Sequence, residues 1–196
     1  MTTPMTVADF IASLQREAGA SGAAKSPPPV ERWNPPFCGD SFIEILRDGS
    51  WRHEGVRMTR ESLVRLFASI LRKDADGITY LVTPVEKVSV KVEDAPFLAV
   101  RADREGVGRD QTIAFTTNMG DVAAVGPDHP LRVETTNGEP RPYVLVRGRL
   151  EARVLRAPFY ELVDWAEEEA TPEGPHLGVW SGGAFFPIGP VGAHLQ

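Results

Sequence analysis

The sequence predicts an α+β protein in which helices lie on one side of antiparallel β-sheets. The first observation is a valine at every second position from Val88 to Val92, the period of a half-buried strand. The second is an apolar stripe at helical spacing between Arg60 and Lys73. The third is one order of elements (strand, turn, strand, helix, hairpin) that recurs in both halves of the chain.

Length and composition are those of a globular protein of one compact unit or two small ones. The chain has 196 residues, of which 42% are hydrophobic and 24% charged. A net charge of −6 argues against nucleic acid as a partner, because phosphates attract basic surfaces. Cys38 is the single cysteine, so no internal disulfide is expected. The first twenty residues do not resemble a secretory signal, and no apolar run suits a membrane span, so we expect a cytoplasmic protein without membrane contact.

The first 36 residues are expected to form a short helix and a proline-rich strap. Thr6 to Asp9 resembles a capping box, and apolar residues at helical spacing extend the predicted helix from about Val7 to Glu17. Ser26–Pro29 and Asn34–Pro36 frame a stiff, extended connector. Trp33, between these proline runs, is expected to seat against the following domain.

Residues 37–100 are predicted to form a first unit of hairpin, helix and hairpin. Asp48 and Gly49 supply a tight turn between its first strands, and Thr59 is a good N-cap for the helix. The expected elements are strands at Phe42–Leu46 and Trp51–Val56, a helix at Arg60–Lys73, and strands at Tyr80–Val82 and Val88–Val92. Pro84 marks a hairpin, bend or edge, because proline cannot donate to a strand ladder.

Residues 101–196 are predicted to form a second β-rich unit that repeats this order. The expected elements are strands at Phe97–Ala102, Thr112–Thr117, Leu131–Glu134, Tyr143–Arg147 and Leu150–Leu155, a helix beginning near Pro158, and a hairpin of Val179-Trp180 with Ala184–Phe186. Laid over each other, the halves match at Arg47 with Arg147, Gly49 with Gly148, Arg57 with Arg156, and Leu63-Val64 with Leu162-Val163. We interpret this pattern as an internal duplication.

Several motifs occur together in the first half: Trp33–Asp40, Asp48–Trp51, Leu63–Phe67, Tyr80–Val88 and Val92–Phe97. As a set they resemble the bacterial domain-of-unknown-function family 1285. The motifs cover the chain from Trp33 to Phe97, and the order of elements fits to about Phe186. The resemblance implies a two-part, β-rich protein with repeated structural motifs, for which a part in signal transduction has been suggested. It brings no catalytic residues.

Cys38 is open to two interpretations. As a nucleophile it needs a base, usually histidine, and none of His53, His129, His176 and His194 has a spacing that points to it. We therefore favour a small apolar filler. Metal-binding motifs are also missing from the sequence: Asp74 and Asp76 before Gly77 are better explained as the end of the preceding helix than as part of a calcium loop. No metal or cofactor is expected.

Arginines gather near the second predicted hairpin. Arg147, Arg149 and Arg153 share one strand face if the chain runs straight through Gly148, and with Arg141 and Arg156 they would suit an anion. Glu151 lies among them, and Glu167–Glu169 follows on the predicted helix. We favour a solvated surface of ion pairs.

Polar residues around Pro84 give the candidate binding site. Thr83, Glu86 and Lys87 flank the proline and are placed to line a groove against the strap. The alternative, which we favour, is that Glu86 and Lys87 are the solvent side of an alternating strand. The candidate ligand- or partner-binding residues are Asn34, Cys38, Asp40, Thr83, Glu86 and Lys87.

These observations favour a non-catalytic binding or regulatory protein that recognises a small molecule or a protein partner between its two halves. The rival is a hydrolase of unrecognised type that uses Asp40, Glu86 or Asp94, which requires two carboxylates to converge. A third hypothesis is self-assembly through an exposed sheet edge. The sequence leaves the oligomeric state open.

Overall fold

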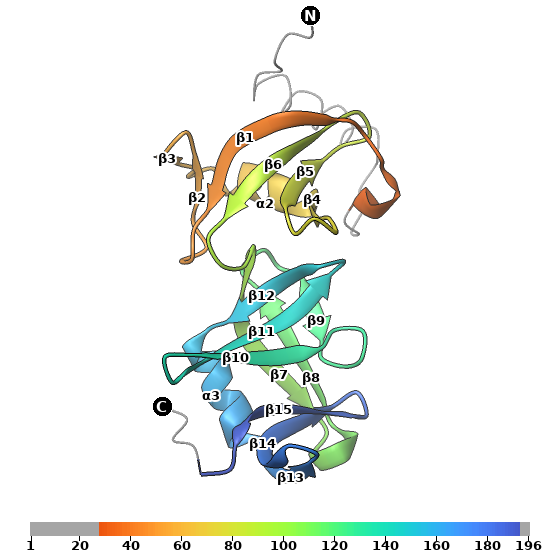
Figure 1. Ribbon diagram of the computed structural model, residues 1–196, viewed down its shortest axis with the longest axis vertical. Coiled ribbons are helices and arrows are strands. Elements are labelled where there is room, and N and C mark those ends of the chain that lie inside the picture. The colour runs from red at the N-terminus through yellow and green to blue at the C-terminus, as the bar shows by residue number, and fades with distance from the viewer. Residues whose placement is uncertain (1–27, 193–196) are drawn as a thin grey trace, which may run out of the picture. The chain divides into compact units, whose positions relative to one another are not determined.

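The computed structural model describes residues 28–192, which divide into two compact units between Glu93 and Asp94 (Figure 1). Both units are rich in β-strands, and the described residues of each contain one α-helix, in agreement with the predicted α+β class. The helix predicted for residues 7–17 lies outside the described residues. In the described range no helix is long and apolar enough to cross a membrane. The predicted boundary after Val100 falls inside a strand, whereas the compact units divide before it.

The described residues of the first unit form one six-stranded sheet in the order β3-β2-β1-β6-β5-β4. Its elements are η1 (Val30–Arg32), β1 (Phe37–Ile45), β2 (Trp51–His53), β3 (Val56–Arg57), α2 (Glu61–Ser69), β4 (Leu71–Lys73), β5 (Thr79–Val82) and β6 (Lys87–Val92). The apolar core contains Ile43, Trp51, Phe67 and Leu81, each no more than 1% exposed. The segment before β1 includes the 3-10 turn η1, so it is less extended than predicted for the strap.

Helix α2 is shorter than the apolar stripe predicted. It ends at Ser69, and the chain passes almost directly into β4, where Leu71 pairs with Leu81 of β5. Helical spacing alone cannot find this end, because Leu71 continues the stripe while serving as a strand residue. The N-cap is Arg60 without a side-chain cap bond, so the prediction of Thr59 as the cap is wrong by one residue.

The described residues of the second unit contain a six-stranded sheet in the order β10-β11-β12-β7-β8-β9. Its strands are β7 (Phe97–Glu105), β8 (Thr112–Thr117), β9 (Val122–Ala124), β10 (Leu131–Thr136), β11 (Glu139–Arg147) and β12 (Leu150–Val154), with η2 (Gly108–Asp110) between β7 and β8. Helix α3 (Arg156–Asp164) follows β12 and buries Pro158, Phe159 and Leu162. Pro158 lies in its first turn, where the missing N–H has no helical partner to lose.

The two six-stranded sheets share one topology. Each consists of two antiparallel three-stranded meanders, joined where the first strand of one meander runs parallel to the last strand of the next. The parallel pairs are β1 with β6 and β7 with β12. The prediction of antiparallel hairpins is therefore correct within each meander, but the central pairing is parallel. Along the chain, helix α2 comes between the two meanders of the first unit, whereas helix α3 follows both meanders of the second.

The end of the second unit differs from the predicted repeat. Its closing strands form a separate three-stranded sheet of β13 (Glu167–Thr171), β14 (Gly174–Ser181) and β15 (Ala184–Pro190). Glu167–Glu169, predicted on a helix, lie instead on the edge strand β13. Charged residues suit an edge strand because they discourage pairing with another chain. In this sheet Trp180 stacks against Phe185, with ring centroids 5.5 Å apart.

Substitution of Gly178 tests how tightly the three-stranded sheet is packed. A Cβ at this position would overlap the ring of Phe185 and the backbone oxygen of Phe186. The backbone cannot yield, so we expect Gly178→Ala to lower the free energy of unfolding by about 1–3 kcal/mol, the usual cost of overpacking. Chemical denaturation measures this loss. Gly126→Ala is the matched control, because its Cβ would meet only Gly182 at 3.9 Å. Equal effects of the two substitutions would contradict the packing.

Candidate functional site

The hairpin between β5 and β6 is closed by Thr83. Its backbone N–H donates to the Glu86 carbonyl oxygen at 2.9 Å, and its Oγ1 accepts from the Glu86 N–H at 3.1 Å. Thr83 is 1% exposed and Glu86 4% exposed, although Val85, at the tip between them, is 65% exposed. The turn therefore holds Glu86 in a fixed, buried position immediately below an exposed loop.

Glu86 carries the least satisfied polar group of this hairpin. Its Oε1 is buried and has no hydrogen-bond partner in the part of the chain that the structure describes. Burial raises the pKa of the Glu86 carboxyl above its ordinary value of 4.5. The favoured interpretation of Glu86 as a solvent-facing residue is wrong. The sequence held a signal: extending the alternation of Val88 to Val92 back by two places puts Glu86 on the valine face.

Lys87 is committed to an ion pair on the other face of the sheet. Its Nζ lies 2.8 Å from Asp74 Oδ2 and 4.4 Å from the centre of the Tyr80 ring. Arg72 donates to the same carboxylate, with its Nε 2.6 Å from Oδ1. The Arg72 hydrogen bond, opposed in part by burial and aided by Lys87, holds the pKa of Asp74 below its ordinary value. Lys87 is thus half-buried and paired, so it too departs from the simple solvent-facing interpretation.

Arg72 links this ion pair to the segment before β1. It is 7% exposed, and its Nη1 donates to the carbonyl oxygens of Val30 at 2.8 Å and Trp33 at 2.7 Å. Sequence reasoning missed Arg72 because it placed the residue on a long amphipathic helix. The position of a cation between apolar Leu71 and a second cation, Lys73, gives no signal that the chain has already entered a strand.

The turn between β4 and β5 contains a second acidic residue, Asp76, which contacts Tyr80. Asp76 Oδ1 accepts from the Ile78 N–H at 2.9 Å, which fixes the turn between β4 and β5. Asp76 Oδ2 accepts from the Tyr80 hydroxyl at 2.8 Å, and this bond raises the pKa of Tyr80 to about 12. The acidic residues Asp74 and Asp76 therefore organise a strand turn, whereas the sequence predicted the end of a helix.

The other predicted site residues are exposed and serve local roles. Asn34, Cys38 and Asp40 are exposed. The Cys38 thiol lies 3.6 Å from the Pro36 carbonyl oxygen, and Asp40 Oδ1 accepts from the Phe42 N–H at 2.7 Å. Exposure of Cys38 contradicts its interpretation as a buried filler. Within residues 28–192, no group of three or more His, Cys, Asp or Glu side chains is placed to hold a metal ion.

Asp40 and Glu86, the two carboxylates of the hydrolase hypothesis in the first unit, do not converge. Asp40 pairs with Ser89, so it lies on the same face as Lys87, and alternation places Glu86 on the opposite face. Asp94 belongs to the second unit, where its Oδ1 accepts from the Tyr143 hydroxyl at 2.7 Å. Asp40 and Glu86 therefore do not form the adjacent pair that acid–base hydrolysis would use.

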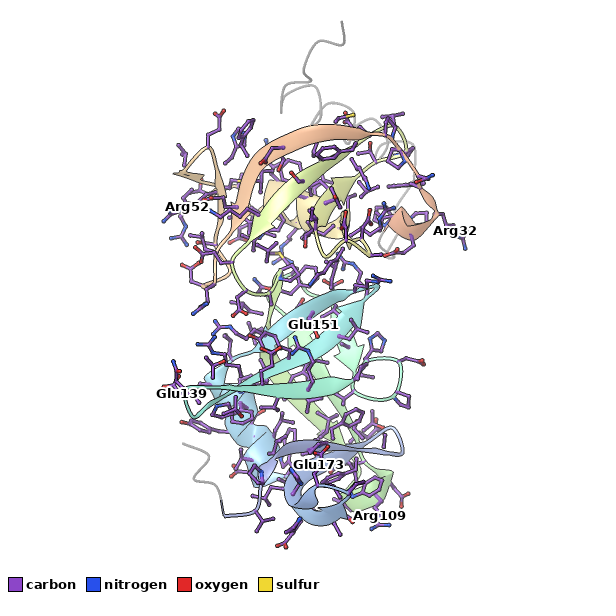
Figure 2. The ribbon with its side chains drawn as sticks, in the orientation of Figure 1. Arg32, Arg52, Arg109, Glu139, Glu151 and Glu173 are labelled. Atoms are coloured by element: carbon purple, nitrogen blue, oxygen red, sulfur yellow. The ribbon has the colours of Figure 1, made fainter. Side chains whose placement is uncertain are left out.

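Two arginines of the predicted cluster, Arg147 and Arg153, form ion pairs in the second unit. Arg147 Nη1 lies 2.7 Å from Asp121 Oδ1, and Arg153 Nε lies 3.3 Å from Asp94 Oδ2. Glu151, labelled in Figure 2, accepts instead from Arg132 at 2.6 Å. For Arg147 and Arg153 the prediction of ion pairs is confirmed, but their side chains are only 20% and 26% exposed, so the prediction of a solvated surface is not.

Comparison with known proteins identifies the family to which this chain belongs. The chain is a two-part, β-rich protein whose halves match two family models, "Domain of unknown function (DUF1285), N-terminal domain" over residues 28–95 and "Protein of unknown function (DUF1285), C-terminal domain" over residues 96–188. The protein therefore belongs to the DUF1285 family, as its motifs suggested. Comparison with the curated proteins gave no match.

Two solved structures are similar. A DUF1285 family protein from Silicibacter pomeroyi DSS-3 is 46% identical and has a TM-score of 0.81, over 91% of this chain and 95% of that one. A DUF1285 family protein from Shewanella baltica OS155 is 28% identical with a TM-score of 0.49, over 63% of this chain and 91% of that one. The first supports the two-part fold described above.

Removal of Arg72 tests the central ion pair. Arg72→Ala leaves Asp74 with Lys87 alone and leaves two backbone carbonyls without their donor. We expect a loss of about 3 kcal/mol in the free energy of unfolding, as for other buried pairs that lose one member. The control is Lys91→Ala, which breaks the exposed pair of Lys91 with Glu44 and is expected to change stability little. Similar losses in both variants, measured by urea unfolding, would contradict this ranking.

The raised pKa of Glu86 predicts a pH-dependent stability. The folded chain holds this proton more tightly than the unfolded chain, so the stabilisation is complete below pH 4.5 and is lost as the pH rises through the raised pKa. Glu86→Gln removes the titration. Urea unfolding from pH 4 to pH 8 should show the variant gaining stability relative to wild type as the pH rises. A difference that is constant across this range would disprove the assignment.

Proposed function

We propose that this protein is a non-catalytic binding protein with a regulatory role, and that its first unit recognises a ligand bearing a cationic nitrogen at Glu86. The observation that carries the proposal is the buried Glu86 Oε1 without a partner among the described residues. A buried polar group left unpaired costs about 1–3 kcal/mol, so its retention favours a role outside the fold itself. An ammonium or guanidinium group supplies the donors and the charge that this carboxyl lacks.

The hairpin gives such a ligand a short route to the acid. Pro84 and Val85 are exposed and directly precede Glu86, so the acid is next in sequence to a solvent-exposed tip that lies outside the ladder of β5 and β6. A cation bound there favours the ionised carboxylate and so lowers the pKa that burial raises. Ligand binding is therefore linked to release of a proton from Glu86.

A regulatory output follows from the neighbouring contacts. Glu86 directly precedes Lys87 in the chain, and Lys87 forms an ion pair with Asp74. Asp74 also pairs with Arg72. Arg72 donates further hydrogen bonds to the carbonyl oxygens of Val30 and Trp33. The hairpin tip is thus linked to the segment before β1 first through the backbone at Glu86-Lys87 and then through the charged contacts of Lys87, Asp74 and Arg72. This coupling supports a role in signal transduction in preference to hydrolysis by Asp40 and Glu86, which lie on opposite faces of the sheet.

Thermal-shift and calorimetric titrations test the binding proposal. The probes are putrescine, lysine and arginine, with 1,4-butanediol and glutarate as uncharged and anionic counterparts of similar length. We expect stabilisation by at least one amine, none by the counterparts, and loss of the effect in Glu86→Gln. Lys87→Ala should weaken binding less than Glu86→Gln, because Lys87 acts through Asp74. Unchanged amine binding in Glu86→Gln, or no stabilisation by any amine, would remove Glu86 as the recognition group.

A further inference from the structure

Phe42 is held in a backbone conformation that disfavours it. Its φ is +55°, in the left-handed region where a side chain other than glycine or asparagine costs about 1–2 kcal/mol. It is also 61% exposed, so burial of the aromatic ring does not offset this cost. Strain retained at an exposed, bulky residue points to a function at that residue.

The strain comes from a bulge in β1 that separates Phe42 from its neighbours. Asp40 pairs with Ser89 and Glu44 with Lys91, so β1 spends four residue steps where β6 spends two. On either side of Phe42, Ser41 is 7% exposed and Ile43 is 1% exposed. The Ser41 hydroxyl donates to the Ser89 carbonyl oxygen at 2.6 Å and anchors the bulge to β6. The extra residues turn Phe42 alone out of the sheet.

Two acidic residues are tied to the backbone of Phe42. The Phe42 N–H donates to Asp40 Oδ1 at 2.7 Å, and the Phe42 carbonyl oxygen accepts from the Glu54 N–H at 3.0 Å. Both Asp40 and Glu54 are exposed. Cations on both neighbouring strands face Glu44: Lys91 of β6 pairs with it at 2.7 Å, and Arg52 of β2 is its register partner. Earlier on the same strand, Phe37 adds a second apolar side chain that is 59% exposed.

We propose that Phe42 is the apolar anchor of a docking surface, consisting of Phe37, Asp40, Phe42 and Glu54, for a basic amphipathic helix of a partner protein. The charge complementarity carries the choice of partner: lysine or arginine side chains beside the apolar face of such a helix pair with Asp40 and Glu54 while that face covers the aromatic rings. The net charge of −6 favours the same partners at long range. This surface is independent of the ligand proposed at Glu86.

Stability measurements separate docking from folding. Asparagine tolerates left-handed backbone, so Phe42→Asn should leave the melting temperature equal to or above that of wild type. The matched control is Val56→Asn, which changes another apolar residue of the same unit that is 71% exposed. A clear fall in the melting temperature of Phe42→Asn would show that Phe42 serves the fold, and would overturn the proposal.

Binding measurements use two synthetic helical peptides of equal length, one of leucine and lysine and one of leucine and glutamate. With the full chain, we expect the lysine peptide alone to bind, with affinity at least tenfold weaker for Phe42→Asn, unchanged for Val56→Asn, and reduced by Asp40→Asn with Glu54→Gln and by salt. Failure of the lysine peptide to bind, or equal binding by Phe42→Asn, would overturn the proposal. So would a Phe42-dependent dimer in sedimentation or Phe42-dependent binding to anionic vesicles, which would identify a second copy or a lipid surface as the occupant.

Discussion

The parallel contact between β1 and β6 is the constraint on which the first unit depends. Without it the two meanders would be separate three-stranded sheets, each with two edges and little core. Parallel pairing joins residues far apart in the chain, here Phe37 with Lys87 and Glu44 with Lys91. It brings the segment before β1 beside the β5–β6 hairpin, and it also forces β1 to absorb extra residues where the ladders differ in length. The bulge that carries Phe42 and the position of the segment before β1 are consequences of this one pairing.

The charged contacts around that pairing are unequal in weight. Arg72 is almost fully buried and joins Asp74 to two backbone carbonyls, so it holds a loop segment against the sheet. Lys91 and Glu44 form a pair of similar length on the exposed surface, where solvent screens most of the attraction. Distance alone therefore does not rank these ion pairs. Burial and the number of groups each charge satisfies decide which of them fixes the position of the hairpin.

Most strands were predictable from local pattern, and the errors share one physical cause. Val88 to Val92 and the turn at Asp48-Gly49 are set by period and turn chemistry within a few residues. The end of α2 and strand β13 are set by distant partners: Leu71 by Leu81, and Glu168 by Leu177. The order of the strands along the chain likewise does not indicate that β1 pairs in parallel with β6, or β7 with β12. At the candidate site the sequence placed Thr83 and Glu86 beside the break at Pro84, but it did not predict the hydrogen bonds between them or the burial of Glu86. Arg72 was missed because tertiary pairing ended its helix early.

The two units use their polar groups differently, and this difference bears on where recognition occurs. In the second unit Arg132, Arg147 and Arg153 each meet a carboxylate, and Tyr143 donates to Asp94. These contacts are explained by the stability or specificity of the fold. Buried polar atoms without a partner among the described residues occur in both units, for example Gln111 Oε1 in the second, but Glu86 Oε1 belongs to an acid, and the first unit also holds the exposed Phe42 on left-handed backbone. Local rules are usually broken where function requires it, so recognition is best sought in the first unit.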